Sequence, residues 1–233
     1  MTDALEALRG GLVVSVQAAE ESPLAQPAHM AAIASAAAAG GAAAIRAEGE
    51  ADIAAIKAAV DLPLIGLVKR RVPGSAVYIT PELEDGRAVA RAGADIVATD
   101  ATLRPRPGRL ATREFLAALA RELSVPLLAD VDSVEAGRAA RSAGADAVAT
   151  TLAGYTGGGR VPDGPDLDLV AALSSDLDCP VLAEGRYGSP ESAREARRAG
   201  AFAVVVGTAI SDPEALTRRF AGALDRRGVG TPG

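Results

Sequence analysis

One pattern occurs four times along the chain, and this repeat restricts the possible folds more than any other feature. The segments AAGGAAAIRA, RAGADIVATD, SAGADAVATT and RAGAFAVVVGTA each run from a helix-like stretch through glycine into an apolar run. Their glycines, Gly40, Gly93, Gly144 and Gly200, lie 53, 51 and 56 residues apart. This spacing is about twice the length of one strand–helix unit, so a further strand is expected within each interval.

A second signal marks those intervening strands. DLPLIGLV, SVPLLADV and DCPVLAEG each place a proline just before an apolar run. Proline cannot continue a helix, and glycine after a last helical turn supplies a left-handed cap, so both residues separate a helix from the next strand. Together the two signals predict eight strands, at about 12–17, 43–47, 64–69, 96–101, 127–131, 147–152, 181–185 and 203–207.

The predicted strands are short, nearly continuous apolar runs, which is typical of a parallel sheet covered on both faces. Helical segments lie between them, and Ser189 before Pro190 and Ser211-Asp212 before Pro213 are helix-start signals. Eight such units in 233 residues predict the α/β class and a single (β/α)8 TIM barrel, with residues 1–233 forming one domain. A doubly wound open sheet is the main alternative, but it accounts for neither the even strand count nor the alternating signals.

Composition argues against several partners. A net charge of −6 and a pI near 5.0 disfavour nucleic acids and anionic membranes. The single cysteine, Cys179, cannot form an intramolecular disulfide and is interpreted as a small buried hydrophobe. The sequence shows neither a signal-peptide pattern nor an apolar run of about 20 residues, so we expect a cytoplasmic protein.

Polar side chains stand near the carboxyl ends of five predicted strands, where the active site of a (β/α)8 barrel is built. These residues are Gln17, Arg46, Lys69, Asp130 and Glu184. Because a buried unpaired charge is costly, they are expected to converge on one another and on a polar ligand. The structural alternative is a set of ion pairs that joins Lys69 to Asp130 or Glu184.

The last two predicted units carry a second signal. AEGRYGSPE and VVGTAISDPE each turn from a strand through glycine into a helix start. Backbone N–H groups at such a turn form an anion site, and barrels often bind phosphate after strands 7 and 8. We therefore expect Gly185, Arg186, Gly207 and Thr208 to bind phosphate, although tight turns need glycine in any case.

Other chemistries lack their residues in this sequence. The only histidine, His29, is expected on a helix surface, which leaves no basis for histidine catalysis or a histidine-rich metal site. There is no G-x-S-x-G elbow and no P-loop, the segment GTAIS contains no G-x-G-x-x-G, and neither a metal nor a cofactor is expected. The segment YTGGGR at 155–160 lacks a lysine and is interpreted as a loop that covers substrate.

Nine motifs occur in order between about residues 12 and 210: VVSVQA, AIRAEG, IGLVKR, VYITP, DATLRPRP, LLADV, TTLAGYT, LAEGRY and AVVVGTAI. As a set, they resemble the N-acetylmannosamine-6-phosphate 2-epimerase family. The resemblance implies a (β/α)8 barrel that interconverts N-acetylmannosamine 6-phosphate and N-acetylglucosamine 6-phosphate in sialic-acid catabolism. It places the catalytic pair on Lys69 and Glu184 and the substrate contacts on Gln17, Arg46, Asp130 and Arg186. The segment AAEESPLAQPAHM departs from the family by its many small residues.

The expected reaction needs two titratable groups, because the C2 proton leaves one face of the open-chain sugar and another proton arrives on the opposite face. Lys69 can act as the base only when neutral, and Arg46 with Arg70 or Arg71 is expected to favour that form. Glu184 must be able to hold a proton. Arg46 is expected to stabilise the enolate-like intermediate, and Asp130 to orient Lys69 or a sugar hydroxyl.

Two other functions stay open from the sequence. Another sugar-phosphate barrel isomerase is one, although pentulose-phosphate epimerases usually use metal-binding histidines that this chain lacks. A non-catalytic sugar-phosphate-binding protein is the other. Barrels of this size often dimerise, so a homodimer is compatible with the sequence.

Overall fold

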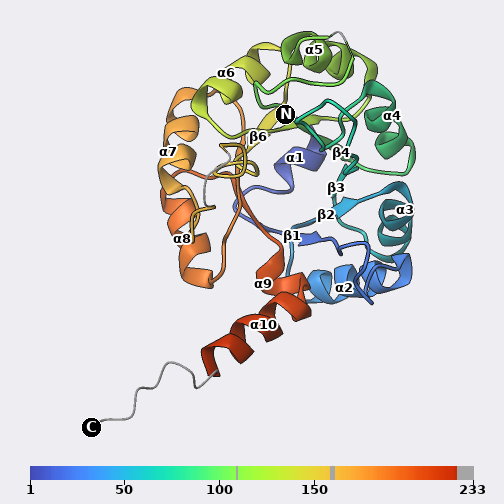
Figure 1. Ribbon diagram of the computed structural model, residues 1–233, viewed down its shortest axis with the longest axis vertical. Helices are drawn as coiled ribbons and strands as arrows, with labels where there is room; N and C mark the ends of the chain where they lie inside the picture. Colours follow the sequence, from blue (N-terminus) through green and yellow to red (C-terminus); the bar gives the residue numbers. More distant parts are fainter. Residues whose placement is uncertain (109, 158–160, 225–233) are drawn as a thin grey trace.

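The computed structural model describes residues 1–108, 110–157 and 161–224, and it contains a closed barrel of eight parallel strands in the order β1 to β8 (Figure 1). The predicted (β/α)8 fold is therefore confirmed. The strands are β1 (Leu12–Val16), β2 (Ala44–Glu48), β3 (Leu64–Leu67), β4 (Ile96–Asp100), β5 (Leu127–Asp130), β6 (Ala147–Ala149), β7 (Val181–Glu184) and β8 (Ala203–Val206). Several end one or two residues earlier than predicted, and β6 ends three residues earlier, at Ala149.

Most of the helices surround the barrel (Figure 1). They are α1 (Asp3–Glu6), α2 (Pro27–Ala39), α3 (Glu50–Ala59), α4 (Leu83–Arg91), α5 (Thr112–Glu122), α6 (Val134–Ser142), α7 (Leu167–Asp176), α8 (Pro190–Arg198), α9 (Thr208–Ser211) and α10 (Pro213–Leu224). The predicted start of α8 is confirmed, since the Ser189 side chain accepts a hydrogen bond from the backbone N–H of Ser192. None of the helices in these described ranges is long and apolar enough to span a membrane.

The glycine signals act as predicted, with one difference. Gly93, Gly144 and Gly200 adopt positive φ angles of 108°, 106° and 102°, which is the left-handed region that a residue with a Cβ enters only at a cost. In the first repeat the left-handed residue is Gly41, with φ 93°, and Gly40 keeps a right-handed φ of −79°. The helix therefore ends one residue later than the sequence pattern suggests.

Alternate strand residues fill the barrel, which is apolar at its amino-terminal end. Leu5 and Leu8, in and just after α1, pack against the inward side chains Val13, Ala44 and Ala203. Because α1 closes that end, as Figure 1 shows by its place inside the helical ring, a ligand can enter the interior only from the carboxyl ends of the strands. Successive inward positions lie two residues apart along each strand, so the next ones become the floor and walls of the site.

Helix α10 does not complete the ring. It extends away from the barrel in Figure 1, and none of its residues is buried. Phe220 and Leu224 are 71% and 79% exposed. The last helix of the described chain therefore leaves apolar surface uncovered.

Candidate active site

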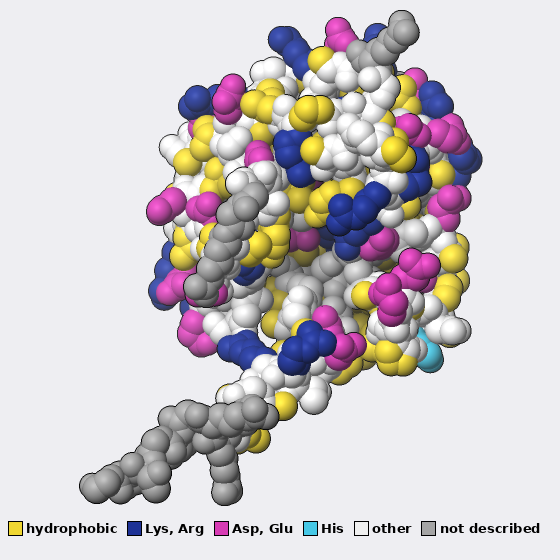
Figure 2. Space-filling view, viewed as in Figure 1, with side chains coloured by type: hydrophobic (Ala, Val, Ile, Leu, Met, Phe, Trp, Pro, Cys, Tyr) yellow, Lys and Arg dark blue, Asp and Glu magenta, His cyan; other side chains and the backbone are white. Residues whose placement is uncertain are grey.

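A cavity of about 540 Å³ opens at the carboxyl ends of the strands. Figure 2 shows the face on which it opens, with acidic and basic side chains gathered around a central hollow. The predicted site residues Gln17, Arg46, Lys69, Glu184, Gly185, Arg186, Gly207 and Thr208 all line it. Asp130 lies beneath this lining and is fully buried. The structure therefore brings together the residues that the sequence predicted.

Arg46 is the centre of the polar floor. Its side chain, 1% exposed, donates two hydrogen bonds to Asp130, with Nη1–Oδ1 and Nη2–Oδ2 distances of 3.1 and 2.7 Å. Its Nη1 also lies 3.0 Å from Oε2 of Glu184, so β2 is linked through one guanidinium to β5 and β7. Burial disfavours the charged guanidinium, but the carboxylates of Asp130 and Glu184 outweigh burial and raise the pKa of Arg46. Arg46 is thus a fixed cation.

Asp130 supports this cation. Its Oδ1 accepts a second hydrogen bond, from the Thr151 hydroxyl at 2.6 Å. The expected contact of Asp130 with Lys69 is not formed, because its carboxylate instead accepts hydrogen bonds from Arg46 and Thr151. Asp130 is fully buried, so it holds Arg46 from beneath the cavity.

Glu184 combines burial with an incompletely satisfied carboxylate. Burial is the largest cause that raises its pKa, Arg46 opposes the change, and the nearby Asp130 charge adds to it, so the pKa is about 7. Its Oε2 is buried and has no hydrogen-bond partner among the described residues, although Arg46 lies within ion-pair distance. A carboxyl with these properties can accept or donate a proton near neutral pH.

Lys69 has different partners from those expected. Its ammonium group forms a salt bridge to Oε2 of Glu48 at 2.9 Å and donates a hydrogen bond to Oε1 of Gln17 at 2.6 Å. The alternative ion pairs of Lys69 with Asp130 or Glu184 are not formed. Of the cations expected beside Lys69, Arg70 instead turns away to form salt bridges with Glu82 and Asp85.

The loop after β7 has unusual backbone geometry. Gly185 adopts φ 113° and Arg186 adopts φ 62°, a left-handed conformation that is uncommon for a residue other than glycine. The Arg186 guanidinium donates hydrogen bonds to the carbonyls of Ala153 and Gly164, both at 2.6 Å. Arg186 therefore fastens the loop between β6 and α7 at the mouth of the cavity, whether or not it also binds a ligand.

The loop after β8 approaches β1 closely. A Cβ on Gly207 would lie 3.4 Å from the Cβ of Ser15. The Ser211 hydroxyl donates a hydrogen bond to the Ser15 carbonyl at 2.6 Å and so fixes α9 against β1. Since the first N–H groups of a helix have no partner inside it, Thr208 at the start of α9 presents backbone donors beside the cavity.

Sequence reasoning missed several lining residues. Glu48 stands two positions after Arg46 on β2, and Thr151 stands two positions after the inward Ala149 of β6. The two-residue alternation of strands could have identified both. Tyr78 comes instead from the long connection between β3 and α4, which folds back so that Ile79 pairs with Lys69. Burial, followed by the charges of Asp130 and Asp100, raises the pKa of Tyr78.

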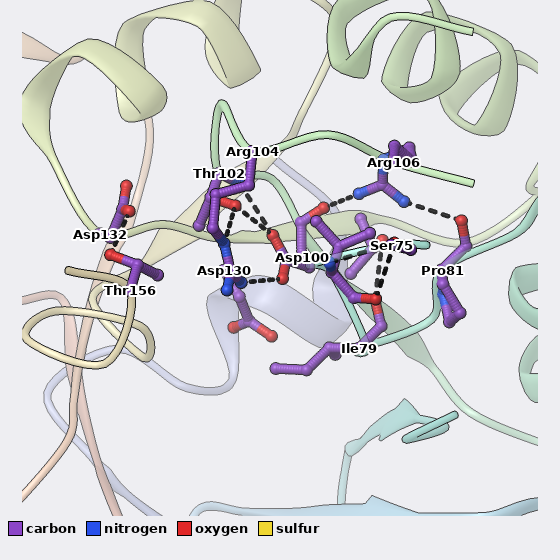
Figure 3. Close-up of polar contacts among 12 residues, drawn as sticks. Ser75, Ile79, Pro81, Asp100, Thr102, Arg104, Arg106, Asp130, Asp132 and Thr156 are labelled. Carbon is purple, nitrogen blue, oxygen red and sulfur yellow. Dashed lines mark hydrogen bonds and ion pairs between the residues drawn. The ribbon is translucent and has the colours of Figure 1, made fainter. Parts of the chain in front are cut away.

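A second buried polar cluster supports that connection (Figure 3). Asp100, at the end of β4, is fully buried and accepts hydrogen bonds from the Thr102 hydroxyl and Arg104, both at 2.7 Å. Arg106 donates to the carbonyls of Asp100 and Pro81. These contacts join the loop after β4 to the segment that carries Tyr78, so the cluster stabilises one wall of the cavity.

Two of the remaining sequence candidates, His29 and Cys179, do not line this cavity. His29 is exposed on α2, as expected. Cys179 packs against apolar residues, and burial raises the pKa of its thiol, which fits the interpretation as a small hydrophobe. No group of three or more His, Cys, Asp or Glu side chains in the described ranges could hold a metal ion. In the loop predicted to cover substrate, 155–160, residues 158–160 lie outside the described part, while Tyr155 lines the cavity.

Comparison with known proteins assigns the barrel to a family. A family model described as "Putative N-acetylmannosamine-6-phosphate epimerase" matches residues 30–226. The chain belongs to the N-acetylmannosamine-6-phosphate epimerase family. The match extends over β2 to β8 and therefore includes most of the residues that line the cavity.

Relatives in the family resemble the chain over nearly its whole length. Proteins from Caldanaerobacter subterraneus and Cutibacterium acnes, each named "Putative N-acetylmannosamine-6-phosphate 2-epimerase", are 48% and 47% identical over 94% of this chain and 92% and 96% of their own lengths. The solved N-acetylmannosamine-6-phosphate 2-epimerase from Clostridium perfringens is 36% identical and superposes with a TM-score of 0.91, covering 96% of this chain and 97% of that one.

Proposed function

We propose that this chain interconverts N-acetylmannosamine 6-phosphate and N-acetylglucosamine 6-phosphate by moving protons at C2 of the open-chain sugar. The observation that carries the proposal is the placement of Lys69 and Glu184. Lys69 follows β3, and Glu184 is the last residue of β7. These two strands lie four positions apart in a closed ring of eight, so the two side chains face each other across the cavity. An epimerase needs such groups on the two faces of its substrate. The names of the relatives support the same reaction.

The protonation states of the two residues suit proton transfer in both directions. Lys69 is an ammonium group paired with Glu48, and Glu184, with a pKa of about 7, is divided between its two forms at neutral pH. A sugar whose C2 proton faces Glu184 then meets a carboxylate base on one side and an ammonium acid on the other. The reverse reaction uses the same pair after one proton has moved from the lysine to the glutamate.

Arg46 assists the reaction as a positive charge beneath the sugar. Removal of the C2 proton places negative charge on the C1 oxygen of an enolate-like intermediate. Since Asp130 holds the guanidinium in a fixed position, the Arg46 charge needs no reorganisation when that intermediate forms. Gln17 is held by hydrogen bonds to Lys69 and Ser15, and from this position it can contact a sugar hydroxyl.

The substrate phosphate is assigned to the loops after β7 and β8. Gly185, Arg186, Gly207 and Thr208 line the same side of the cavity, on neighbouring strands, and backbone N–H groups at a strand–helix turn bind anions well. The Arg186 guanidinium is engaged with two carbonyls, so its contribution is a positive charge near the phosphate and a fixed loop.

Proton NMR in D2O tests the reaction. The protein is incubated with N-acetylmannosamine 6-phosphate without added metal or cofactor. The expected product is N-acetylglucosamine 6-phosphate that carries deuterium at C2. If the sugar phosphate binds but neither converts nor exchanges its C2 proton, the chain is a binding protein and the proposal is wrong.

Two variants assign the bases individually. With Lys69→Ala, Glu184 can still remove the C2 proton that faces it, so one epimer exchanges with D2O without conversion. With Glu184→Gln, exchange is restricted to the other epimer, whose C2 proton faces Lys69. Exchange of the same epimer in both variants would contradict the placement of the two residues on opposite faces.

The chain is also proposed to form a homodimer through α10. This helix buries none of its residues, and Phe220 and Leu224 expose large apolar side chains that a second copy would cover. Light scattering after size exclusion should give twice the monomer mass, and Phe220→Glu should lower it. A monomer at all accessible concentrations would exclude the dimer. The cytoplasmic location and the role in sialic-acid catabolism stay predictions.

A further inference from the structure

Strand β2 presents two inward side chains of opposite charge to the two proton-transfer residues. Arg46 lies 3.0 Å from Glu184, and Glu48, two residues nearer the mouth, lies 2.9 Å from Lys69. Each proton-transfer residue therefore has its own counter-ion, and the two counter-ions come from one strand. The mechanism above accounts for Arg46 but gives no role to Glu48.

The charges around Lys69 single out Glu48. From β1 the ammonium group receives only the neutral Gln17. On β7, Glu184 interacts with Lys69 only at longer range, and the Lys69 charge has the smallest of the effects on the pKa of Glu184. Arg46 is paired with Asp130 and Glu184. Arg70 is paired with Glu82 and Asp85, and Arg71 lies 5.7 Å from the centre of the Tyr78 ring. Within these described surroundings, Glu48 is the carboxylate in direct contact with Lys69.

The charge of Glu48 also affects the pKa of a residue on α3, the helix that follows β2. Burial raises the pKa of Asp52 on α3, and the negative charge of Glu48 raises it further. Glu48 is 27% exposed and Lys69 is 40% exposed, so the pair lies at the cavity rim, partly screened by water. Glu48 therefore acts on Asp52 as well as on Lys69.

An epimerase with an ammonium and a carboxylate on opposite walls faces a physical problem. With no third charge, the two groups attract each other across the empty cavity, and their direct ion pair would occupy the place of the sugar. It would also allow the proton to pass between them without substrate. The flexible stem of lysine makes this movement easy.

We propose that Glu48 is the positioning residue for Lys69. Its carboxylate holds the ammonium group on the β2–β3 side of the cavity, away from Glu184, until the substrate binds between Lys69 and Glu184. The proposal rests on the proposed epimerase activity. It differs from a structural salt bridge because it ties the Glu48 charge to the pH dependence of turnover.

The kinetic test compares Glu48→Gln with Glu48→Asp. Glu48→Gln keeps the size and hydrogen bonding of the side chain but removes the charge. We expect kcat to fall about tenfold with KM changed less than about twofold, since a mispositioned proton donor affects chemistry more than binding. The alkaline limb of the kcat/KM profile should move to lower pH, and the acid limb should stay in place.

Glu48→Asp retains the charge and should restore the alkaline limb to the wild-type position even if kcat stays low. Glu50→Gln is the matched control, because it removes the same charge from an exposed residue two positions along the chain and should leave both limbs unchanged. Movement of neither limb in Glu48→Gln, or equal movement of both, overturns the proposal. Wild-type inactivity would instead overturn the proposed function.

A direct measurement separates these two failures. The chain contains only two lysines, Lys57 and Lys69, so protein labelled with carbon-13 at lysine Cε gives two resonances, and Lys57→Arg assigns them. Lys57 is paired with Asp95 and serves as an internal reference. The Lys69 resonance of Glu48→Gln should titrate at lower pH than in wild type, with Lys57 unchanged. An unchanged Lys69 titration overturns the proposal whether or not the protein is an epimerase.

Discussion

Replacement of Glu184 by glutamine should stabilise the protein at alkaline pH while it removes activity. The buried floor contains one cation, Arg46, and two carboxylates, Asp130 and Glu184. Ionisation of Glu184 therefore leaves an uncompensated negative charge, and burial raises its pKa from 4.5 to about 7. Glutamine has nearly the same shape and stays neutral at every pH.

The sign follows from linkage. Because the folded protein binds the Glu184 proton more tightly than the unfolded chain does, this group favours folding below pH 4.5, and that contribution is lost as pH rises from 4.5 through 7. A change of this size corresponds to about 3 kcal/mol, the limit that Glu184→Gln can recover. In a chain of this length, that is roughly 6–12 °C in Tm.

Urea unfolding of wild type and Glu184→Gln at pH 5 and pH 8 measures the effect. The free energies of unfolding should be similar at pH 5, and the variant should be more stable at pH 8. Glu191→Gln, whose side chain is 70% exposed on α8, is the control and should differ little from wild type at either pH. A variant that is less stable than wild type at pH 8 would refute the argument that Glu184 is a destabilising buried carboxylate.

Three further predictions follow from the same floor and its loops. The kcat/KM of wild type should decline as pH falls below about 7, because protonation of Glu184 removes the base in one direction, and a pH–rate profile checks this. Arg46→Met should cost about 3–5 kcal/mol of unfolding free energy at pH 8 and less at pH 5, since it leaves Asp130 and Glu184 buried without a cation. Urea titrations at the two pH values would contradict this if the loss were the same at both. Arg186→Ala should raise KM for the phosphorylated sugar at least tenfold more than for the unphosphorylated sugar, and it should speed proteolysis of the loop that carries Ala153 and Gly164. An equal change in KM for both sugars would remove the phosphate assignment.

The barrel could be predicted from the chain because its signals are local. Glycine and proline each mark the passage from a helix to a strand through backbone geometry that involves only neighbouring residues. Strand ends were less predictable, as β6 shows, because hydrogen bonds from the adjacent strands decide where a strand stops. The departure of α10 could not be predicted either, since a helical pattern does not specify what its apolar side chains contact.

The sequence by itself determined the (β/α)8 barrel and placed Gln17, Arg46, Lys69 and Glu184 at one end of it, because strand order and the two-residue alternation are sufficient for that. Only the tertiary structure decided which charges meet. Arg46 and Asp130 are 84 residues apart in the chain yet share two hydrogen bonds, whereas Lys69 pairs with Glu48 on the neighbouring strand. Such pairing depends on the depth of each side chain in the closed ring and on its burial, and no local pattern encodes either.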